Sequence, residues 1–202
     1  MRGIRSGGIY HNGRFSPPQV IELTPHSLYA DEMNHLAHVQ NRGVTAVIGT
    51  PPEKALLEAM TQLALMGNVS LIDSAEQFDK QLLADEVRQN TSLVDETMAR
   101  VRVIRPFTCH QVVQHLEESQ PTSALILLNF LTLFYVETLP DSEAVRLVRS
   151  SVTQIRRLGR QVPVVLTVKP APLPQRTGLL KFIRGVAHQV YVFESPSDTK
   201  SP

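Results

Sequence analysis

Residues 44–60 read VTAVIGTPPEKALLEAM, and this stretch is the starting point for predicting the fold. It begins with five apolar or small residues, continues through a glycine and two prolines, and ends in the pattern of a helix. A short run without polar alternation is typical of a strand that is buried on both faces, as in a parallel sheet. We therefore interpret the stretch as a strand, a tight connection and a helix.

Further apolar runs alternate with helical patterns along the rest of the chain. Near-continuous hydrophobic strands separated by helices indicate a three-layer α/β domain with a mainly parallel central sheet and right-handed crossovers. In such a sheet, ligands bind at the carboxyl ends of the strands, so functional residues are expected just after each run. The further runs are residues 69–73, 101–104, 124–130, 162–168 and 189–194.

The predicted helices have apolar residues at helical spacing. Leu56, Met60 and Leu63 form such a stripe within residues 53–66. Thr108 and Gln111 have the spacing of a capping box, which predicts that a helix begins after Thr108. The helix predicted over residues 142–158 has a stripe formed by Val145, Val148, Val152 and Ile155.

Composition predicts one soluble domain. The chain has 202 residues, 42% of them hydrophobic and 19% charged, with a net charge of +1. That charge provides no global attraction to nucleic acid or membranes. A single cysteine, Cys109, excludes an intramolecular disulfide and favours a reducing compartment. We find no run long enough for a signal peptide or a membrane span, so we expect a cytoplasmic protein with no membrane partner.

The domain organisation follows from the ends of the chain. Residues 1–18 are rich in Gly, Arg and Pro and are predicted to be a flexible segment. Residues 19–194 are predicted to form the core domain, and residues 195–202 a disordered tail.

The connection after the first strand has part of the pattern of a nucleotide-binding P-loop. A P-loop uses glycines to point backbone N–H groups at phosphate, a lysine for the outer phosphates, and a Ser or Thr hydroxyl for magnesium. Here Gly49 and Lys54 are present, but their spacing is one residue short. Pro51 and Pro52 have no N–H to donate, and Ala55 has no hydroxyl.

The connections after the later strands carry a second group of residues. Residues 71–79 read LIDSAEQFD, and residues 101–108 read VRVIRPFT before a helix that contains Gln111. The strand at 124–130 has the position of one that ends in an acidic, magnesium-organising residue in phosphoryl-transfer enzymes. Asn129, which is neutral, occupies that position.

Taken in order, these stretches resemble the RecA-like recombinase superfamily, especially its archaeal and eukaryotic recombinase branch. The resemblance covers residues 44–194. It rests on the P-loop region, on LID followed by a phenylalanine, on the V-x-V-x-R-P-F-T stretch and on the apolar strand ending at Asn129. It implies a three-layer RecA-like P-loop NTPase fold and, in active relatives, ATP hydrolysis.

Further departures from the family pattern concern its catalytic groups. The glutamate that activates the attacking water in active relatives aligns with Ala75, and Glu76 follows one place later. The polar sensor after the last central strand, commonly Asn-Gln, is replaced by Thr167, Val168 and Lys169. Loss of one group that stabilises a transition state typically costs about 10²–10³ in rate. We therefore expect no enzyme activity and no cofactor, with retained ATP binding as the alternative.

Three vestigial nucleotide-binding positions remain under this resemblance, namely Gly49, Lys54 and Asn129. Lys54 is either a ligand for one phosphate or a solvated lysine in the first turn of a helix. Asn129 is either a ligand group or a buried amide at the end of a strand.

Basic residues provide candidate DNA contacts. Arg146, Arg149, Arg156 and Arg160 share one face of the predicted helix. This face either follows a nucleic-acid backbone, contacts an acidic partner, or is an ordinary solvated face. The Pro-rich segment 169–185 is predicted to be a loop, and in recombinases loops in this part of the fold touch DNA. The alternative is a rigid connector. The candidate DNA-binding residues are Arg149, Arg156, Lys169, Arg176, Lys181 and Arg184.

Metal and nucleophile patterns are weak. His35 with His38, and Cys109 with His110, have no companions at zinc spacing. We find no Ser/His/Asp set that the sequence alone supports. An acidic metal site after the second strand is the alternative to ordinary loop and helix-start acids for Asp73, Glu76 and Asp79.

The functional expectation is a non-catalytic recombinase paralogue that acts as an accessory protein in DNA recombination or repair. It would act through DNA contacts and through a protein partner or homo-oligomer, with Ile9, Tyr10 and Phe15 as a hypothetical docking segment. One alternative is a nucleotide-binding regulatory or signalling module that does not hydrolyse nucleotide. Another is a purely structural interaction protein.

Overall fold

The computed structural model describes residues 19–23, 42–120 and 123–193. Several predictions concern residues outside these ranges. They are the flexible segment 1–18 with Ile9, Tyr10 and Phe15, the pair His35 and His38, and the tail 195–202.

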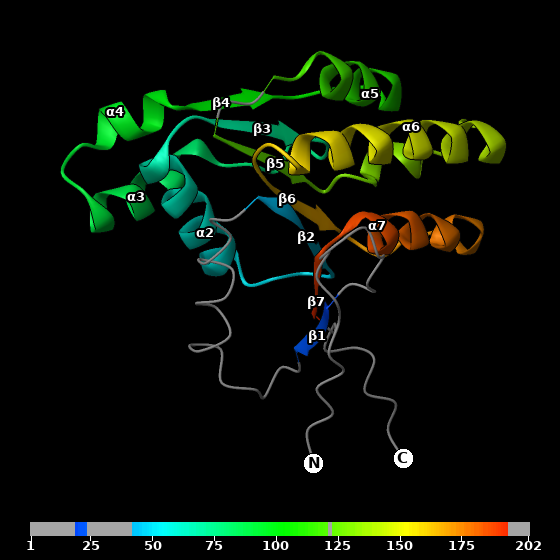
Figure 1. Cartoon of the computed structure of the whole chain (residues 1–202). Helices are drawn as coiled ribbons and strands as arrows, with labels where there is room; N and C mark the ends of the chain where they lie inside the picture. Colours follow the sequence, from blue (N-terminus) through cyan, green and yellow to red (C-terminus); the bar gives the residue numbers. More distant parts are fainter. Residues whose placement is uncertain (1–18, 24–41, 121–122, 194–202) are drawn as a thin grey trace, which may run out of the picture.

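The centre of the molecule is one sheet of seven strands, all of them parallel, in the order β1-β7-β2-β6-β5-β3-β4 (Figure 1). Helices flank the sheet, so the predicted three-layer α/β class is confirmed. The strands are β1 (Gln19–Leu23), β2 (Gly43–Ile48), β3 (Val69–Asp73), β4 (Val101–Ile104), β5 (Ala124–Leu128), β6 (Pro163–Val168) and β7 (Gln189–Phe193).

One helical layer packs on each face of the sheet. The first contains α5 (Cys109–Glu118), α6 (Asp141–Gly159) and α7 (Leu180–Val186). The second contains α2 (Glu53–Met66), α3 (Lys80–Asn90) and α4 (Val94–Ala99). Alternate residues of β5 belong to the two cores, Leu125 to the first and Ile126 to the second. Full burial of such a side chain stabilises the fold by roughly 1.5–3 kcal/mol.

The capping prediction for α5 is confirmed at its N-cap. Thr108 Oγ1 accepts a hydrogen bond from the Gln111 backbone N–H at 3.2 Å. The Gln111 side chain reaches back to the backbone N–H of Phe107, at 2.7 Å, which is one residue before the expected partner. The two bonds satisfy backbone donors that the start of the helix leaves free.

Strand β5 is shorter than predicted. The apolar run extends to residue 130, but the strand ends at Leu128 because Asn129 adopts a left-handed conformation with φ of 50°. The chain turns there and enters the short 3₁₀ helix η1 (Thr132–Phe134). Phe130 leaves the sheet and packs against Phe134, with ring centroids 5.3 Å apart. Phe130 is therefore part of the hydrophobic core although it lies outside the strand.

The prediction of a loop over residues 169–185 is wrong for its second half. The 3₁₀ helix η2 (Pro174–Leu179) leads directly into α7. Pro174 lies at the start of η2, where its missing N–H breaks no helical hydrogen bond. Leu179, Ile183 and Val186 recur at helical spacing and are buried against the first layer. Burial of this stripe stabilises the helix more than the glycines and prolines of the segment destabilise it.

The sequence analysis did not predict β1. This strand pairs in parallel with β7 and extends the sheet beyond the core runs. Its five residues, QVIEL, include two polar residues and no long apolar run, so the sequence pattern alone is ambiguous.

The strand order determines where a ligand site is expected. Strand β2 lies between β6 and β7, and the connection from β6 to β7 crosses it. Ligands of open α/β sheets bind outside the carboxyl ends of the strands, near such a change of direction. Within the described residues, none of the helices has the length and apolar character needed to cross a membrane.

Candidate functional site

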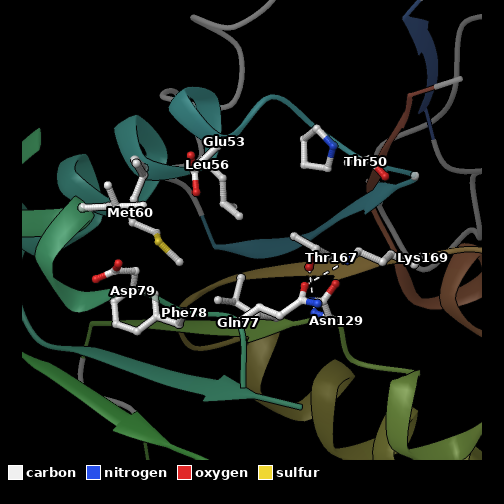
Figure 2. Close-up of a pocket in the computed structure, with 15 residues that line it drawn as sticks. Thr50, Glu53, Leu56, Met60, Gln77, Phe78, Asp79, Asn129, Thr167 and Lys169 are labelled. Atoms are coloured by element: carbon white, nitrogen blue, oxygen red, sulfur yellow. Dashed lines mark hydrogen bonds between the residues drawn. The ribbon is translucent and has the colours of Figure 1, made fainter. Parts of the chain in front are cut away.

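A pocket of about 230 Å³ lies at the carboxyl ends of β2, β3, β5 and β6 (Figure 2). The turns after these four strands supply its polar lining, and α2 and α3 supply most of its apolar lining. This is the edge of the sheet at which the strand order predicts a ligand. The polar and charged lining residues are Thr50, Glu53, Gln77, Asp79, Asn129, Thr167 and Lys169.

The turn after β2 is closed against the neighbouring strands. Gly49 has φ of 100°, which favours glycine, and its N–H donates to the Val168 carbonyl at 2.9 Å. A Cβ atom on Gly49 would lie 2.1 Å from the Phe193 carbonyl oxygen. Close packing between β2 and β7 therefore requires this glycine. Its N–H already has a partner and is not free for phosphate.

The start of α2 also differs from a phosphate cradle. Pro52 is the N-cap and provides no side-chain cap, while Glu53 places a carboxylate at the pocket. The Lys54 side chain is 73% exposed and forms an ion pair with Glu58 at 3.7 Å. Lys54 does not line the pocket, whereas Gly49 and Asn129, the other two vestigial positions, do.

A buried carboxylate shapes the turn after β3. Asp73 is fully buried and accepts hydrogen bonds from the backbone N–H groups of Ala75, at 3.2 Å, and Phe78, at 2.8 Å. Arg105 Nε lies 4.0 Å from the Asp73 carboxylate, and Arg105 Nη2 donates to the Phe78 carbonyl at 3.0 Å. These contacts fix the turn in one conformation.

The acids near Asp73 do not gather around a common point. Asp79 is the N-cap of α3 and accepts from the Gln81 N–H at 2.7 Å. Glu76 is exposed, has φ of 53° and does not line the pocket. The part of the chain that the structure describes holds no group of three His, Cys, Asp or Glu residues placed to bind a metal. The contacts of Asp73 and Asp79 are those of loop and helix-start acids.

Three turns bring side chains together at the polar end of the pocket. Lys169 Nζ donates to Gln77 Oε1 at 2.9 Å, and Asn129 Nδ2 lies 3.3 Å from the same oxygen. Thr167 Oγ1 accepts from the Asn129 backbone N–H at 2.8 Å and holds its left-handed turn (Figure 2). The sequence analysis listed Asn129 and Lys169 but missed Gln77. The general rule of searching after each apolar run points to Gln77, which lies four residues beyond β3.

The Tyr135 side chain contacts the backbone of Lys169. Its hydroxyl donates to the Lys169 backbone carbonyl at 3.2 Å. Burial of the ring raises the pKa of Tyr135 far above its ordinary value, so the hydroxyl stays protonated and remains a donor. The bond restrains the backbone that presents the ammonium group to the pocket. No pattern in the sequence indicates this contact.

A second feature is the charge of the C-terminal part of the domain. Nine of the 20 Lys and Arg residues lie between residues 144 and 193, and none of the 19 Asp and Glu residues does. Several of these cations are exposed on neighbouring helices α6 and α7. We define the basic face as the exposed cations of these two helices without an ion pair among the described residues, namely Arg149, Arg156, Arg160 at the C-cap of α6, Lys181 and Arg184.

An aromatic ring joins the two helices of the basic face. The guanidinium of Arg149 lies 5.4 Å from the ring centroid of Phe182, and Lys181 Nζ lies 5.2 Å from it. Phe182 is half-buried, so its ring supports the two cations through cation–π contacts and is not free to stack on a base.

The other two candidate DNA contacts are not on this face. Arg176 is only 3% exposed, and its guanidinium pairs with the Asp141 carboxylate at 3.0 Å and donates to the Phe134 and Leu139 carbonyls. The selection of Arg176 as a DNA contact is therefore wrong, because this side chain is committed to tying η2 to the preceding turns. Lys169 points into the pocket.

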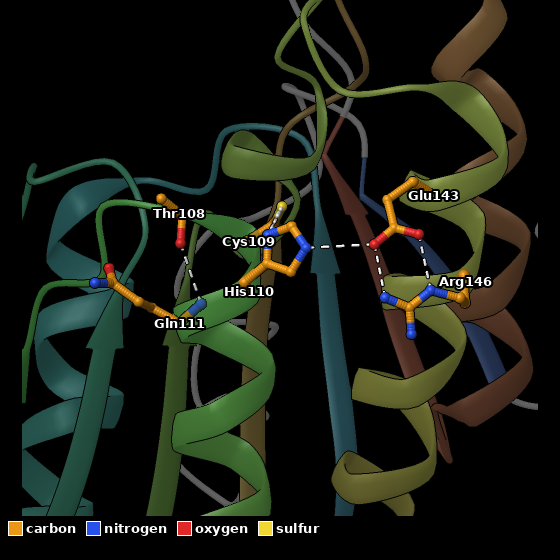
Figure 3. Close-up of polar contacts among 6 residues, drawn as sticks. All are labelled: Thr108, Cys109, His110, Gln111, Glu143 and Arg146. Atoms are coloured by element: carbon orange, nitrogen blue, oxygen red, sulfur yellow. Dashed lines mark hydrogen bonds and ion pairs between the residues drawn. The ribbon is translucent and has the colours of Figure 1, made fainter.

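A chain of polar contacts connects the starts of α5 and α6 (Figure 3). Cys109 Sγ lies 3.8 Å from His110 Nδ1, and His110 Nε2 lies 3.3 Å from Glu143 Oε1. Two hydrogen bonds from the Arg146 guanidinium lower the pKa of Glu143 to about 2. Burial raises the pKa of the Cys109 thiol, so it lacks the thiolate character of a nucleophile. We therefore interpret these contacts as structural ones that connect the starts of the two helices.

The comparisons with known proteins add no relative. The chain matches no protein-family profile, and no curated protein matches its sequence. The pocket and the basic face are therefore the two features from which a function can be proposed.

Proposed function

We propose that the protein is a non-catalytic RecA-like accessory protein of DNA recombination or repair, and that it contacts the DNA backbone through the basic face. The observation that carries the proposal is the acid-free segment 144–193, which gathers exposed cations on α6 and α7 in a chain whose net charge is only +1. Clustered Lys and Arg residues on one surface attract phosphates and release counterions.

The absence of hydrolysis is supported by the turns at the pocket. The N–H of Gly49 donates to Val168, Pro51 and Pro52 have no N–H, and Lys54 pairs with Glu58. These groups would have to reorganise before they could hold a polyphosphate. A site that must reorganise loses the preorganised electrostatic stabilisation on which phosphoryl transfer depends.

The type of contact follows from the side chains. Each exposed guanidinium or ammonium can pair with a phosphate oxygen, and the Phe182 ring lies beneath two of them. We therefore expect binding that does not depend on base sequence and that weakens steeply with salt.

The test measures DNA binding by fluorescence anisotropy over a range of salt concentrations, with duplex and single-stranded oligonucleotides. The triple variant Arg149→Gln, Arg156→Gln, Lys181→Gln should reduce the slope of log K against log salt by about one for each cation. The matched control is Lys54→Gln, Lys80→Gln, Arg88→Gln, which removes three exposed cations from the opposite helical layer. Equal losses in both variants, or no binding by the unaltered protein, would overturn the proposal.

A nucleotide-binding regulatory module is the second candidate, because the pocket lies where this sheet topology places ligands. Thermal unfolding with ATP or ADP and magnesium distinguishes it. A specific nucleotide at a hundredfold excess over its Kd stabilises the protein by about 2.7 kcal/mol. A stabilisation of that order, without DNA binding, would replace the first proposal by this one.

A further inference from the structure

We propose that the pocket binds a small organic monocarboxylate with an apolar body. The carboxylate would lie at the polar end, near Lys169, Gln77 and Asn129, and the apolar body would lie against α2 and the start of α3. This inference does not depend on the role in DNA metabolism, because the basic face and the pocket use different residues.

The orientation of the two amides shows that the polar end of the pocket has more hydrogen-bond donors than acceptors. Lys169 is only a donor, so the Gln77 atom 2.9 Å from it must be the oxygen. Asn129 contacts the same oxygen and must present its NH₂ group to it. After these contacts, the lysine ammonium and both amides still have N–H groups without a partner among the described residues. A cluster with an excess of donors is complementary to an anionic oxygen ligand.

The charges around the pocket favour a single negative charge on the ligand. Lys169 is the one cation that lines the pocket, and its contact is with a neutral amide, with no ion pair among the described residues. Glu53 and Asp79 also line the pocket, on the side away from Lys169 (Figure 2), so a negative charge is favoured only beside Lys169 and a second negative charge is repelled. A phosphate dianion or a polyphosphate is therefore a poorer match than a carboxylate, which is monovalent and can accept from two neighbouring donors.

The opposite end of the pocket combines apolar side chains with the carboxylates of Glu53 and Asp79. Figure 2 shows Leu56, Met60 and Phe78 on the side away from Lys169 and Asn129. Leu82 also lines the pocket and is 38% exposed, so apolar surface there is accessible to a ligand. Each methylene buried against such a wall strengthens binding roughly fourfold.

The volume limits the size of the ligand. The pocket holds about 230 Å³, which is space for roughly eight water molecules. Pockets for drug-sized ligands range over about 300–1,000 Å³. An acid with a body of about five to eight carbon atoms fits this space, whereas a nucleotide exceeds it and would extend out of the pocket.

The experiment uses the full chain with ¹³C-methyl-labelled methionine. The chain has five methionines, and Met60 lines the pocket, while Met66 at the end of the same helix is 50% exposed and does not. Met60→Leu assigns the signal. Hexanoate should shift the Met60 signal and not that of Met66. Hexanamide, which has the same size but no charge, should need at least about a tenfold higher concentration, as expected for loss of a charge-assisted hydrogen bond.

Two variants test the position of the carboxylate. Lys169→Met should weaken hexanoate binding at least about tenfold and leave hexanamide binding unchanged, because only the charged contact is removed. Lys181→Met is the matched control on the basic face, where the same substitution should have no effect. Both lysines are exposed, so neither change should impair folding.

Chain length and competing anions complete the test. Butyrate, which is shorter by two methylenes, should bind more weakly than hexanoate by roughly fifteenfold. The proposal is overturned if hexanoate and hexanamide act alike, or if Lys169→Met changes neither. It is also overturned if inorganic phosphate or ADP shifts the Met60 signal where hexanoate does not, up to about 20 mM, which saturates a site of millimolar Kd.

Discussion

The turns after β2 and β5 lie at the same edge of the sheet, and each depends on a residue with positive φ. Gly49 has φ of 100° and Asn129 has φ of 50°. The first turn is closed, because its glycine is packed against the Phe193 carbonyl and its N–H donates to Val168. The second is open, because the Asn129 side chain reaches into the pocket and contacts Gln77.

The two turns show two different reasons for a residue with positive φ after a strand. A glycine in this position resembles part of a phosphate cradle, yet close packing against β7 is sufficient to require it. Asparagine tolerates the left-handed region because its short polar side chain forms local hydrogen bonds. Asn129 therefore adopts the backbone conformation that the turn requires and still presents its amide to the pocket. The closed turn is expected to govern stability, and the open turn to govern binding.

Gly49→Ala should have the largest effect on stability. The new methyl group would meet the Phe193 carbonyl oxygen at 2.1 Å in a backbone conformation that alanine rarely adopts. Backbone strain and overpacking together should cost about 3 kcal/mol or more. Thermal unfolding should show a decrease in Tm of roughly 10 °C. Gly178→Ala is the control, because no atom lies within 4 Å of the added methyl, and an equal loss there would refute the packing argument.

Asp73→Asn should destabilise the third turn of this edge, which carries Gln77. The buried carboxylate accepts from two backbone N–H groups, and asparagine would direct an NH₂ group at one of them. Charge-assisted bonds of this kind contribute about 2 kcal/mol. Urea denaturation measures the loss. Asp79→Asn provides the comparison, because asparagine is also a good N-cap and should cost little.

Substitutions of Asn129 should separate stability from binding. Asn129→Ala should lower stability by about 1 kcal/mol, because alanine is less favourable in the left-handed region, whereas Asn129→Gly should be nearly neutral. Both remove the amide and should weaken hexanoate binding equally, which the methionine-methyl titration measures. If only the alanine variant lost binding, the amide would have no direct role in the pocket.

The sequence predicts the core of the sheet more successfully than its edge and its site. Apolar runs such as residues 163–168 identify the central strands because burial on both faces leaves a continuous signal. Strand β1 has no such signal, and its assignment depends on pairing with β7. The burial of Arg176 could not be predicted from the sequence, because it depends on carbonyls about 40 residues away in the chain. Gln77 became a site residue only when the fold placed it beside Lys169.

A partly buried carboxylate outside the pocket, Glu143, should give the smallest effect, with a distinctive dependence on pH. Hydrogen bonds from Arg146 lower the pKa of Glu143 from 4.5 to about 2 in the folded protein. The resulting stabilisation is fully present above the unfolded pKa and is lost as pH falls from about 4.5 to about 2. The Tm difference between the unaltered protein and Glu143→Gln should therefore be greatest near neutral pH and should disappear by about pH 2. Glu137→Gln, at an exposed position with no ion pair among the described residues, should show no such trend. A difference that grows as the pH falls would mean that the contact with Arg146 does not stabilise the fold.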